Sequence, residues 1–192
     1  MRQQCSTCHY PVKTCICHAV QPVSNLTEVI VLQHPKESLH AKNTVRLLQL
    51  ALTKISTYVG KSADDFSPLR HKLSTDPKPT AVFYPSPDSS AISAVTSRDT
   101  TRITRVIFID SSWKQAFGIW QNNPWLNQFT FYQLPAETTG QYHIRQSKLQ
   151  HSLSTLEAVA YGLYYVEQLD PKPLVDLLCA FTQRWQTYIP VR

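Results

Sequence analysis

Hydrophobic residues in this chain gather in short runs that are separated by polar segments. Runs rich in apolar, β-branched and aromatic residues predict strands at 27–34, 57–60, 80–86, 105–110 and 128–135. Pro85 ends the third of these strands, because proline cannot donate a backbone hydrogen bond to a sheet. The runs at 27–34 and 105–110 each contain four consecutive apolar residues, which predicts buried strands.

Apolar residues that recur every three or four positions predict helices between and after these strands. Asn43 is a suitable N-cap for a first helix, in which Val45, Leu48 and Leu52 keep helical spacing. A second helix follows the strand at 105–110, where the apolar repeat consists of Trp113, Ala116, Phe117 and Trp120.

Two more helices are predicted near the carboxyl terminus. The segment 154–169 opens with a capping box, in which Ser154 caps the helix and Glu157 reaches back to it. Its buried stripe is predicted to consist of Leu156, Val159, Ala160 and Leu163. The segment 173–188 is amphipathic and has Pro173 at its start; Cys179 lies on it and is expected to be a small buried side chain.

The remaining segments are polar and predict loops at 61–79, 87–104 and 136–151. Strands that alternate with helices are typical of the α/β class, so we expect a mainly parallel sheet with flanking helices. No apolar run approaches the length of a membrane span, and the first ten residues lack the apolar core of a signal peptide. We therefore expect no membrane partner and a cytoplasmic location, while the sequence leaves the oligomeric state open.

Composition narrows the function. The 192 residues carry a formal net charge of +6, which permits an RNA partner but is equally typical of an ordinary basic protein. The chain has only four glycines, and no two are close enough to form a phosphate-binding loop. Both the P-loop and the dinucleotide-binding glycine motif are thereby excluded.

Four of the five cysteines lie within the first 17 residues, and this cluster consists of Cys5, Cys8, Cys15 and Cys17. Their C-x2-C and C-x-C pairs predict one tetrahedral zinc site, and four protein ligands leave no position open for chemistry, so the zinc is expected to be structural. Disulfides are the alternative, which a reducing cytoplasm disfavours. We expect a small knuckle at 1–20 and a main domain at 21–192.

The segment DSSW at 110–113 follows the buried strand 105–110 directly. Ligands of open α/β sheets bind at the carboxyl ends of strands, so Asp110 is a candidate functional acid. Asp110, Ser111 or Ser112 could equally cap the next helix, and Trp113 could belong to the core.

Several short motifs, read in order, resemble the DTW-domain family. They are QHPKE at 33–37, NT at 43–44, FYPS at 83–86, DSSWKQA at 110–116, YHIR at 142–145 and LSTLEAVA at 153–160, together with the cysteine pairs. The family usually has threonine where this chain has Ser112. Each motif is weak alone, but the ordered set spans nearly the whole chain.

This resemblance implies a tRNA-uridine aminocarboxypropyltransferase. Such enzymes transfer the 3-amino-3-carboxypropyl group of S-adenosylmethionine to N3 of uridine, in the variable loop of tRNA for bacterial members, and release methylthioadenosine. The resemblance also implies a fold related to SPOUT methyltransferases, which have a trefoil knot at the cofactor site.

The resemblance assigns provisional roles to the motif residues. Asp110 is expected to act as general base or to orient the uracil, and Trp113 to stack on a base. The expected cofactor contacts are Tyr84, Pro85, Ser112, Tyr142, Arg145, Ser154 and Thr155. The other motif positions are His34, Glu37, Asn43, Thr44 and Glu157, of which Glu157 is interpreted as the capping-box partner. A basic surface is predicted from Lys36, Lys42, Arg46, Lys114, Arg145 and Lys148.

Two other functions fit the same residues. One is an S-adenosylmethionine-dependent RNA methyltransferase, and the other is a zinc-containing RNA-binding protein without catalytic activity. A hydrolase built on Asp110, Ser111 and His34 is disfavoured, because the serine lacks the glycine pattern of a nucleophile elbow.

Overall fold

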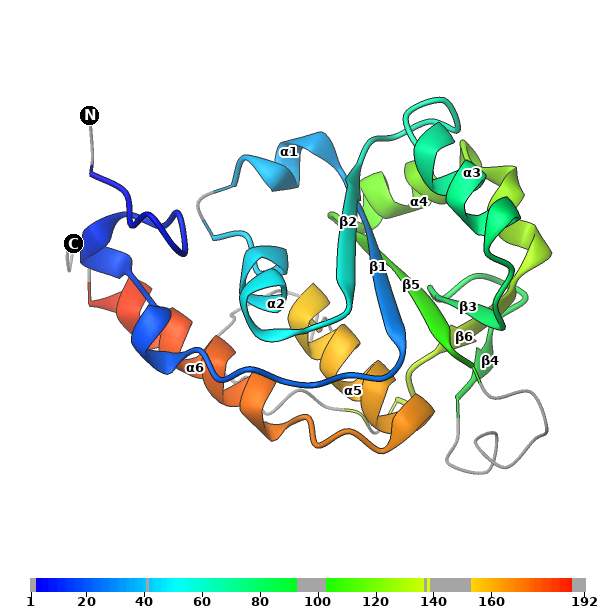
Figure 1. Ribbon diagram of the computed structural model, residues 1–192. Coiled ribbons are helices and arrows are strands. Elements are labelled where there is room, and N and C mark those ends of the chain that lie inside the picture. The colour runs from blue at the N-terminus through cyan, green and yellow to red at the C-terminus, as the bar shows by residue number, and fades with distance from the viewer. Residues whose placement is uncertain (1–2, 41, 93–102, 137, 139–152, 188–192) are drawn as a thin grey trace.

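The computed structural model describes residues 3–40, 42–92, 103–136, 138 and 153–187. Within them, six parallel strands form one sheet in the order β2-β1-β5-β3-β6-β4 (Figure 1). The strands are β1 (Glu28–Gln33), β2 (Ile55–Val59), β3 (Thr80–Phe83), β4 (Ser90–Ala91), β5 (Arg105–Asp110) and β6 (Thr130–Gln133). The predicted α/β class with a mainly parallel sheet is confirmed.

Helices cover both faces of this sheet. The α-helices of the described residues are α1 (Pro35–Ser38), which buries no residue, α2 (Val45–Ala51), α3 (Ser67–Thr75), α4 (Trp113–Gln121), α5 (Thr155–Glu167) and α6 (Lys172–Gln186). Helices α2, α5 and α6 lie on one face, and α3 and α4 lie on the other (Figure 1). Within the described part of the chain, no helix is both long and apolar enough to cross a membrane.

The two faces of the central strands build two separate cores. Successive side chains of a strand point to opposite faces, so neighbouring residues of β5 enter different cores. Val106 and Phe108 pack with α5 and α6, whereas Ile107 packs with α3 and α4. This double burial explains the nearly continuous apolar run from which the strand was predicted.

The segment 61–79, predicted as a loop, contains a helix, and this prediction was wrong. Helix α3 begins at Ser67 with Pro68 in its first turn and buries Leu69 and Leu73 against the sheet. Each turn of this helix contributes only one buried apolar residue, and the other positions are polar. The sequence therefore lacks the broad apolar stripe from which a helix is predicted. The predicted loop at 87–104 likewise contains the two-residue strand β4.

The predicted stripe on α4 was also partly wrong. Ala116 and Ile119 are the buried residues of this helix. Trp113 and Phe117 are 53% and 54% exposed. The helix therefore turns Ala116 and Ile119 to the sheet, and the aromatic side chains of Trp113 and Phe117 to the solvent.

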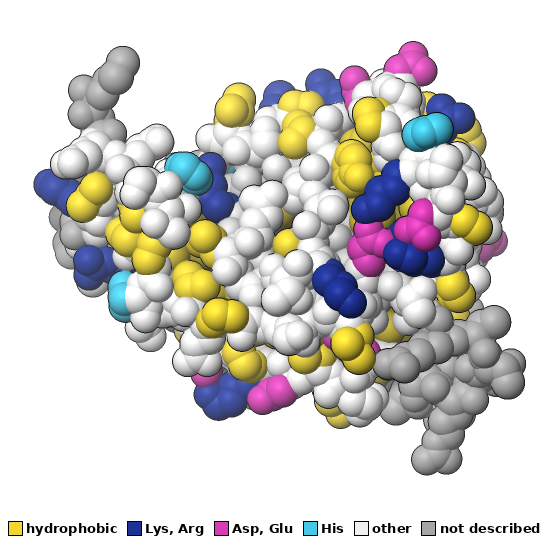
Figure 2. Space-filling view, viewed as in Figure 1, with side chains coloured by type: hydrophobic (Ala, Val, Ile, Leu, Met, Phe, Trp, Pro, Cys, Tyr) yellow, Lys and Arg dark blue, Asp and Glu magenta, His cyan; other side chains and the backbone are white. Residues whose placement is uncertain are grey.

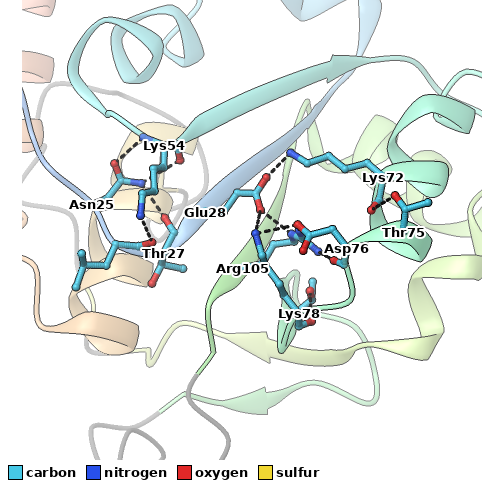
Figure 3. Close-up of polar contacts among 11 residues, drawn as sticks. Asn25, Thr27, Glu28, Lys54, Lys72, Thr75, Asp76, Lys78 and Arg105 are labelled. Atoms are coloured by element: carbon cyan, nitrogen blue, oxygen red, sulfur yellow. Dashed lines mark hydrogen bonds and ion pairs between the residues drawn. The ribbon is translucent and has the colours of Figure 1, made fainter.

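An ion-pair network lies at the amino ends of the neighbouring strands β1 and β5 (Figure 3). Arg105 is fully buried, and its guanidinium donates to Glu28 at 2.8 Å and to the Asp76 carboxylate at 2.7 Å. Lys72 and Lys78 add further ion pairs to the same two acids. Figure 2 shows acidic and basic side chains side by side on this face of the molecule, near α3. Burial alone would raise the pKa of Glu28, but hydrogen bonds from Lys72 and Arg105 outweigh it and lower that pKa.

Candidate active site

The candidate site lies at the carboxyl ends of β1 and β5, which are neighbours in the sheet. After β1 the chain continues to β2 on one side, whereas after β5 it continues to β6 on the other. Connections that leave in opposite directions open a crevice between the two strand ends, and ligands of α/β proteins bind in such crevices. Asp110 is the last residue of β5, so the strand carries its carboxylate to this crevice.

A cavity of about 790 Å³ occupies this position, within the size range of small-molecule sites. Several predicted site residues line it together, although they come from five separate segments. They are Glu37, Asn43, Thr44, Tyr84, Pro85, Asp110, Ser112, Trp113, Ser154 and Thr155. The structure thus brings together ten of the motif positions that lie far apart in the sequence.

The Asp110 carboxylate is nearly buried and is held by two neutral donors. Thr155 donates its hydroxyl to Oδ1, and Gln33 donates its side-chain amide to Oδ2 at 2.8 Å. None of the ion pairs in the described part of the chain involves Asp110. Among the described residues, the acid is therefore oriented by neutral groups, which leaves it able to accept a further hydrogen bond or a proton from a bound molecule.

The analysis of the sequence missed Gln33 as a site residue. It is buried at the end of β1, directly opposite Asp110 in the register of the two parallel strands. Its side-chain amide also donates to Asn43 Oδ1 at 3.2 Å. A signal for it did exist: both apolar runs end in a polar residue, and parallel neighbours place such residues at the same edge of the sheet.

Aromatic side chains form part of the cavity wall. Trp113 stands half exposed at the start of α4, so the alternative that it belongs to the core is wrong. Tyr84 is buried and packs against Trp120, with ring centroids 5.8 Å apart. An exposed indole beside an oriented carboxylate is suited to stack on a planar heterocycle.

Two helix starts meet at the cavity, and both have capping boxes. Ser112 is the N-cap of α4, and its backbone N–H and hydroxyl donate to Gln115 Oε1. Ser154 is the N-cap of α5, and Glu157 Oε2 accepts its backbone N–H and hydroxyl, both at 2.8 Å. The interpretation of Glu157 as a capping-box partner is confirmed, and both helices aim their amide ends toward the site.

His34 does not line the cavity. It is buried and caps α1, where its Nδ1 accepts the Lys36 backbone N–H at 3.2 Å. Burial, assisted by the charges of Lys61 and Lys36, lowers the pKa of His34, which matches a neutral ring that accepts this bond. Its place is thus beside the site, where it shapes the turn that presents Glu37.

The residues of the predicted basic surface differ in exposure and in contacts. Lys36 and Lys114 are exposed, and Lys42 lines the cavity. Arg46 is half-buried against the Tyr10 ring, with its guanidinium carbon 4.9 Å from the ring centroid. The remaining predicted residues Tyr142, Arg145 and Lys148 lie outside the described residues, as does most of the predicted loop at 136–151.

The four amino-terminal cysteines form a separate candidate metal centre. All four Sγ atoms lie within 4.8 Å of one another. Cys5 and Cys17 are 3.7 Å apart between sulfurs, as are Cys8 and Cys15. Zinc–sulfur bonds of 2.3 Å in a tetrahedron place neighbouring sulfurs about 3.8 Å apart. The thiols therefore already have the spacing that one metal ion requires, whereas a disulfide requires sulfurs about 2.0 Å apart.

The turn that carries the first cysteine pair is tight. His9 has a positive φ of 54°, a conformation that glycine adopts more easily. The backbone closes around it, since the Cys5 N–H donates to the Tyr10 carbonyl at 2.8 Å. The adjoining residues Cys8, Tyr10 and Ile16 are fully buried in the same core as α5 and α6, so the knuckle packs onto the main body.

The DTW domain, as a family model, matches residues 2–187. The chain belongs to the DTW-domain family. It is 31% identical over 173 residues to tRNA-uridine aminocarboxypropyltransferase 2 of Drosophila melanogaster, covering 86% of this chain and 67% of that relative. It is 30% identical over 191 residues to the protein of the same name from Macaca fascicularis, covering 94% of this chain and 63% of the relative.

A plant relative extends the similarity. tRNA-uridine aminocarboxypropyltransferase A of Arabidopsis thaliana is 28% identical over 134 residues, covering 60% of this chain and 49% of that protein. The DTW domain described here thus spans about half to two thirds of the length of these relatives. No solved structure matches the chain.

Proposed function

We propose that this DTW domain is a tRNA-uridine aminocarboxypropyltransferase with S-adenosylmethionine as donor. The observation that carries the proposal is the Asp110 carboxylate, held by neutral donors in a cavity that also contains an exposed indole. The names of the relatives indicate the reaction, and the cavity contains the acidic and aromatic side chains that such a reaction needs.

The reaction is a displacement at carbon. A bond forms between uridine N3 and the γ-carbon of the donor's methionyl chain, while the bond between that carbon and sulfur breaks and its electrons leave with methylthioadenosine. The N3 proton must be removed, because the protonated imide is a poor nucleophile. Asp110 is placed to accept this proton or the hydrogen bond of the imide, and Trp113 to hold a base by stacking.

S-adenosylmethionine carries a carboxylate, an amine and an adenine, so its site needs polar and aromatic partners at once. The helix starts at Ser112 and Ser154 and the hydroxyl of Thr155 offer donors, while Tyr84 and Trp113 offer aromatic surface. Tyr142 and Arg145 complete the proposed set, with Arg145 as a partner for the methionyl carboxylate. Transfer of the γ-carbon in place of the methyl group then depends on which carbon faces the base.

The proposal also includes a bound metal ion, a division into two domains, a knotted core and a cellular location. The sulfur spacing of the cysteine cluster supports a structural Zn²⁺ in a knuckle at 1–20, with a catalytic domain at 21–192. The parallel sheet with its cavity at strand ends is compatible with the SPOUT-like knotted core that the resemblance implies. We place the enzyme in the cytoplasm, where tRNA is available and thiols stay reduced.

The test is direct. Purified protein is incubated with unmodified tRNA and S-adenosylmethionine, and the digested nucleosides are analysed by mass spectrometry. We expect a uridine that carries the aminocarboxypropyl mass, and methylthioadenosine as co-product. A methyl adduct would overturn the proposal in favour of a methyltransferase, and no product with any tRNA would favour a binding module.

Variants connect the reaction to the site. Asp110→Asn keeps the size of the side chain but removes the acceptor charge, so we expect the rate to fall by about 100-fold or more, as for loss of a general base. Asp176→Asn is the matched control, because Asp176 lies exposed on α6 and pairs with Lys172. An Asp110→Asn enzyme with wild-type turnover would contradict the assigned role.

A further inference from the structure

The cysteine knuckle and the cavity are connected by the segment of residues 42–46, here called the bridging segment. On one side, Lys42, Asn43 and Thr44 line the cavity. On the other side, the same segment contacts the knuckle and α6: Arg46 donates to the His9 carbonyl at 3.2 Å, and the Lys42 ammonium lies 5.8 Å from the Trp185 ring centroid. The bridging segment is therefore in contact with the cysteine knuckle on one side and with the proposed active-site cavity on the other.

Tyr10 makes the shortest contact between the knuckle and the bridging segment. Its side chain is fully buried, and its hydroxyl donates to the Asn43 carbonyl oxygen at 2.6 Å. Its ring packs against Phe181 of α6, with centroids 4.9 Å apart.

The knuckle fixes the position of Tyr10. Its carbonyl accepts the backbone N–H of Cys5, and it stands two residues after Cys8, between the two cysteine pairs. Since Cys5 and Cys8 belong to the thiol cluster, a metal bound there would hold the start of the turn and a residue two positions before the phenol.

From Asn43 the contacts continue to the catalytic carboxylate. Asn43 Oδ1 accepts the Gln33 side-chain amide at 3.2 Å and the Val45 backbone N–H at 2.9 Å. The same Gln33 amide donates to Asp110 Oδ2 at 2.8 Å. The backbone of Asn43 is thus held from the knuckle and its side chain from the group that orients Asp110.

We propose that Tyr10 is a positioning residue, through which the cysteine knuckle sets the bridging segment and thereby the affinity of the cavity for its donor molecule. The inference assigns the knuckle a role in ligand binding, in addition to closing the amino-terminal end of the fold. The identity of the donor, S-adenosylmethionine, rests on the proposed function, whereas the contacts among Tyr10, Asn43, Gln33 and Asp110 do not.

Tyr10→Phe is the decisive variant, because it keeps the ring against Phe181 and removes only the hydrogen bond to Asn43. We expect the Kd for S-adenosylmethionine, measured by titration calorimetry well below the melting temperature, to rise about three- to tenfold, the change that loss of one buried hydrogen bond produces. The bound metal per protein should be unchanged. Amide hydrogen exchange of residues 42–46 should become faster even without any ligand.

Thr14→Val is the matched control. Thr14 is also buried in the knuckle, and its hydroxyl donates to the Pro11 carbonyl, which the Thr14 backbone N–H satisfies as well. This variant removes a hydrogen bond of the knuckle without touching the bridging segment, so the Kd and the exchange of residues 42–46 should match the wild type.

Removal of the metal completes the test. Chelation should weaken donor binding more in the wild type than in Tyr10→Phe, because the variant has already lost the contact through which the knuckle acts. Unchanged exchange and Kd in Tyr10→Phe, or an equal loss in Thr14→Val, would overturn the proposal. If the wild type binds no S-adenosylmethionine, the proposed function fails, and the exchange measurement still decides the role of Tyr10.

Discussion

Strands β1 and β5 lie side by side along their whole length, yet their two ends differ in chemistry. At the amino end, Glu28 is paired in register with Arg105, and at the carboxyl end Gln33 is paired with Asp110. The first pair consists of opposite charges inside a network of five charged residues. The second consists of one charge and a neutral amide.

The difference separates stability from function. At the amino end each charge has an opposite charge in contact, so little of it remains to attract a ligand. At the carboxyl end the carboxylate is oriented by neutral donors and faces a cavity, so its charge remains available to a bound molecule. One strand pair thus carries a structural end and an end that we propose to be reactive, here called the reactive end; the two lie about 17 Å apart along six residues.

The largest effect is expected from breaking the structural end. Arg105→Met fills a similar volume but removes the charged hydrogen bonds to Glu28 and Asp76, so that Glu28 keeps only the more exposed partners Lys72 and Lys78. We expect this loss to cost about 3 kcal/mol or more. Urea unfolding should show this loss in the free energy of unfolding. Turnover per folded molecule should stay near the wild type, because the change lies at the opposite end of β5.

Lys172→Met is the control for this experiment. Its partner Asp176 lies one turn further along α6, and both side chains are exposed. Such surface pairs contribute little, so unfolding should be indistinguishable from the wild type. Equal effects of the two variants would contradict the structural role of Arg105.

A smaller effect is expected from changing the reactive end. Gln33→Leu replaces the amide with an apolar side chain of similar size and removes its hydrogen bonds to Asp110 Oδ2 and to Asn43 Oδ1, which still accepts the Val45 N–H. We expect kcat/KM to fall about tenfold, the effect of losing the bond to Asp110 at about 1.4 kcal/mol, with a smaller loss of stability than in Arg105→Met. Gln49→Leu is the matched control, since Gln49 donates to Thr57 at the surface. A Gln33→Leu enzyme that is destabilised but catalytically normal per folded molecule would assign Gln33 to the core alone.

The subtlest difference between the two ends is a pH dependence of stability. The folded pKa of Glu28 lies below its ordinary value of 4.5, so its ionisation stabilises the fold fully above that pH. This stabilisation is lost as the pH falls through the lowered pKa, and the free energy of unfolding should decline below about pH 4.5. Unfolding measured between pH 6 and pH 3 should show a shallower decline in Arg105→Met, which lacks one of the groups that lower this pKa. Identical slopes would mean that other acids dominate.

Much of this architecture could be predicted from local sequence. The strand at 105–110 was confirmed with both of its ends, because consecutive apolar residues and a terminal acid mark a strand buried on two faces. The capping box of α5 and the cysteine cluster were predictable for the same reason, since each depends on residues only a few positions apart.

What escaped prediction depends on contacts between distant segments. Gln33 meets Asp110 only because β1 and β5 are neighbours, and 77 positions separate the two residues. The exposure of Trp113 and Phe117 depends on which side of α4 faces the sheet, and helical spacing alone does not define that side. Helix α3 was missed because its narrow apolar side resembles a polar loop until Leu69 and Leu73 are seen to face the same core.

The half-exposed indole of Trp113 also provides an intrinsic fluorescence signal for binding to the cavity. An indole in contact with water emits at longer wavelength than one surrounded by protein, and a molecule stacked on it changes both its brightness and its colour. Trp113 is the most exposed of the four tryptophans and the one that lines the cavity. Occupancy of the pocket can therefore be followed by fluorescence in unlabelled protein, and a Trp113→Phe variant identifies how much of the signal comes from that single ring.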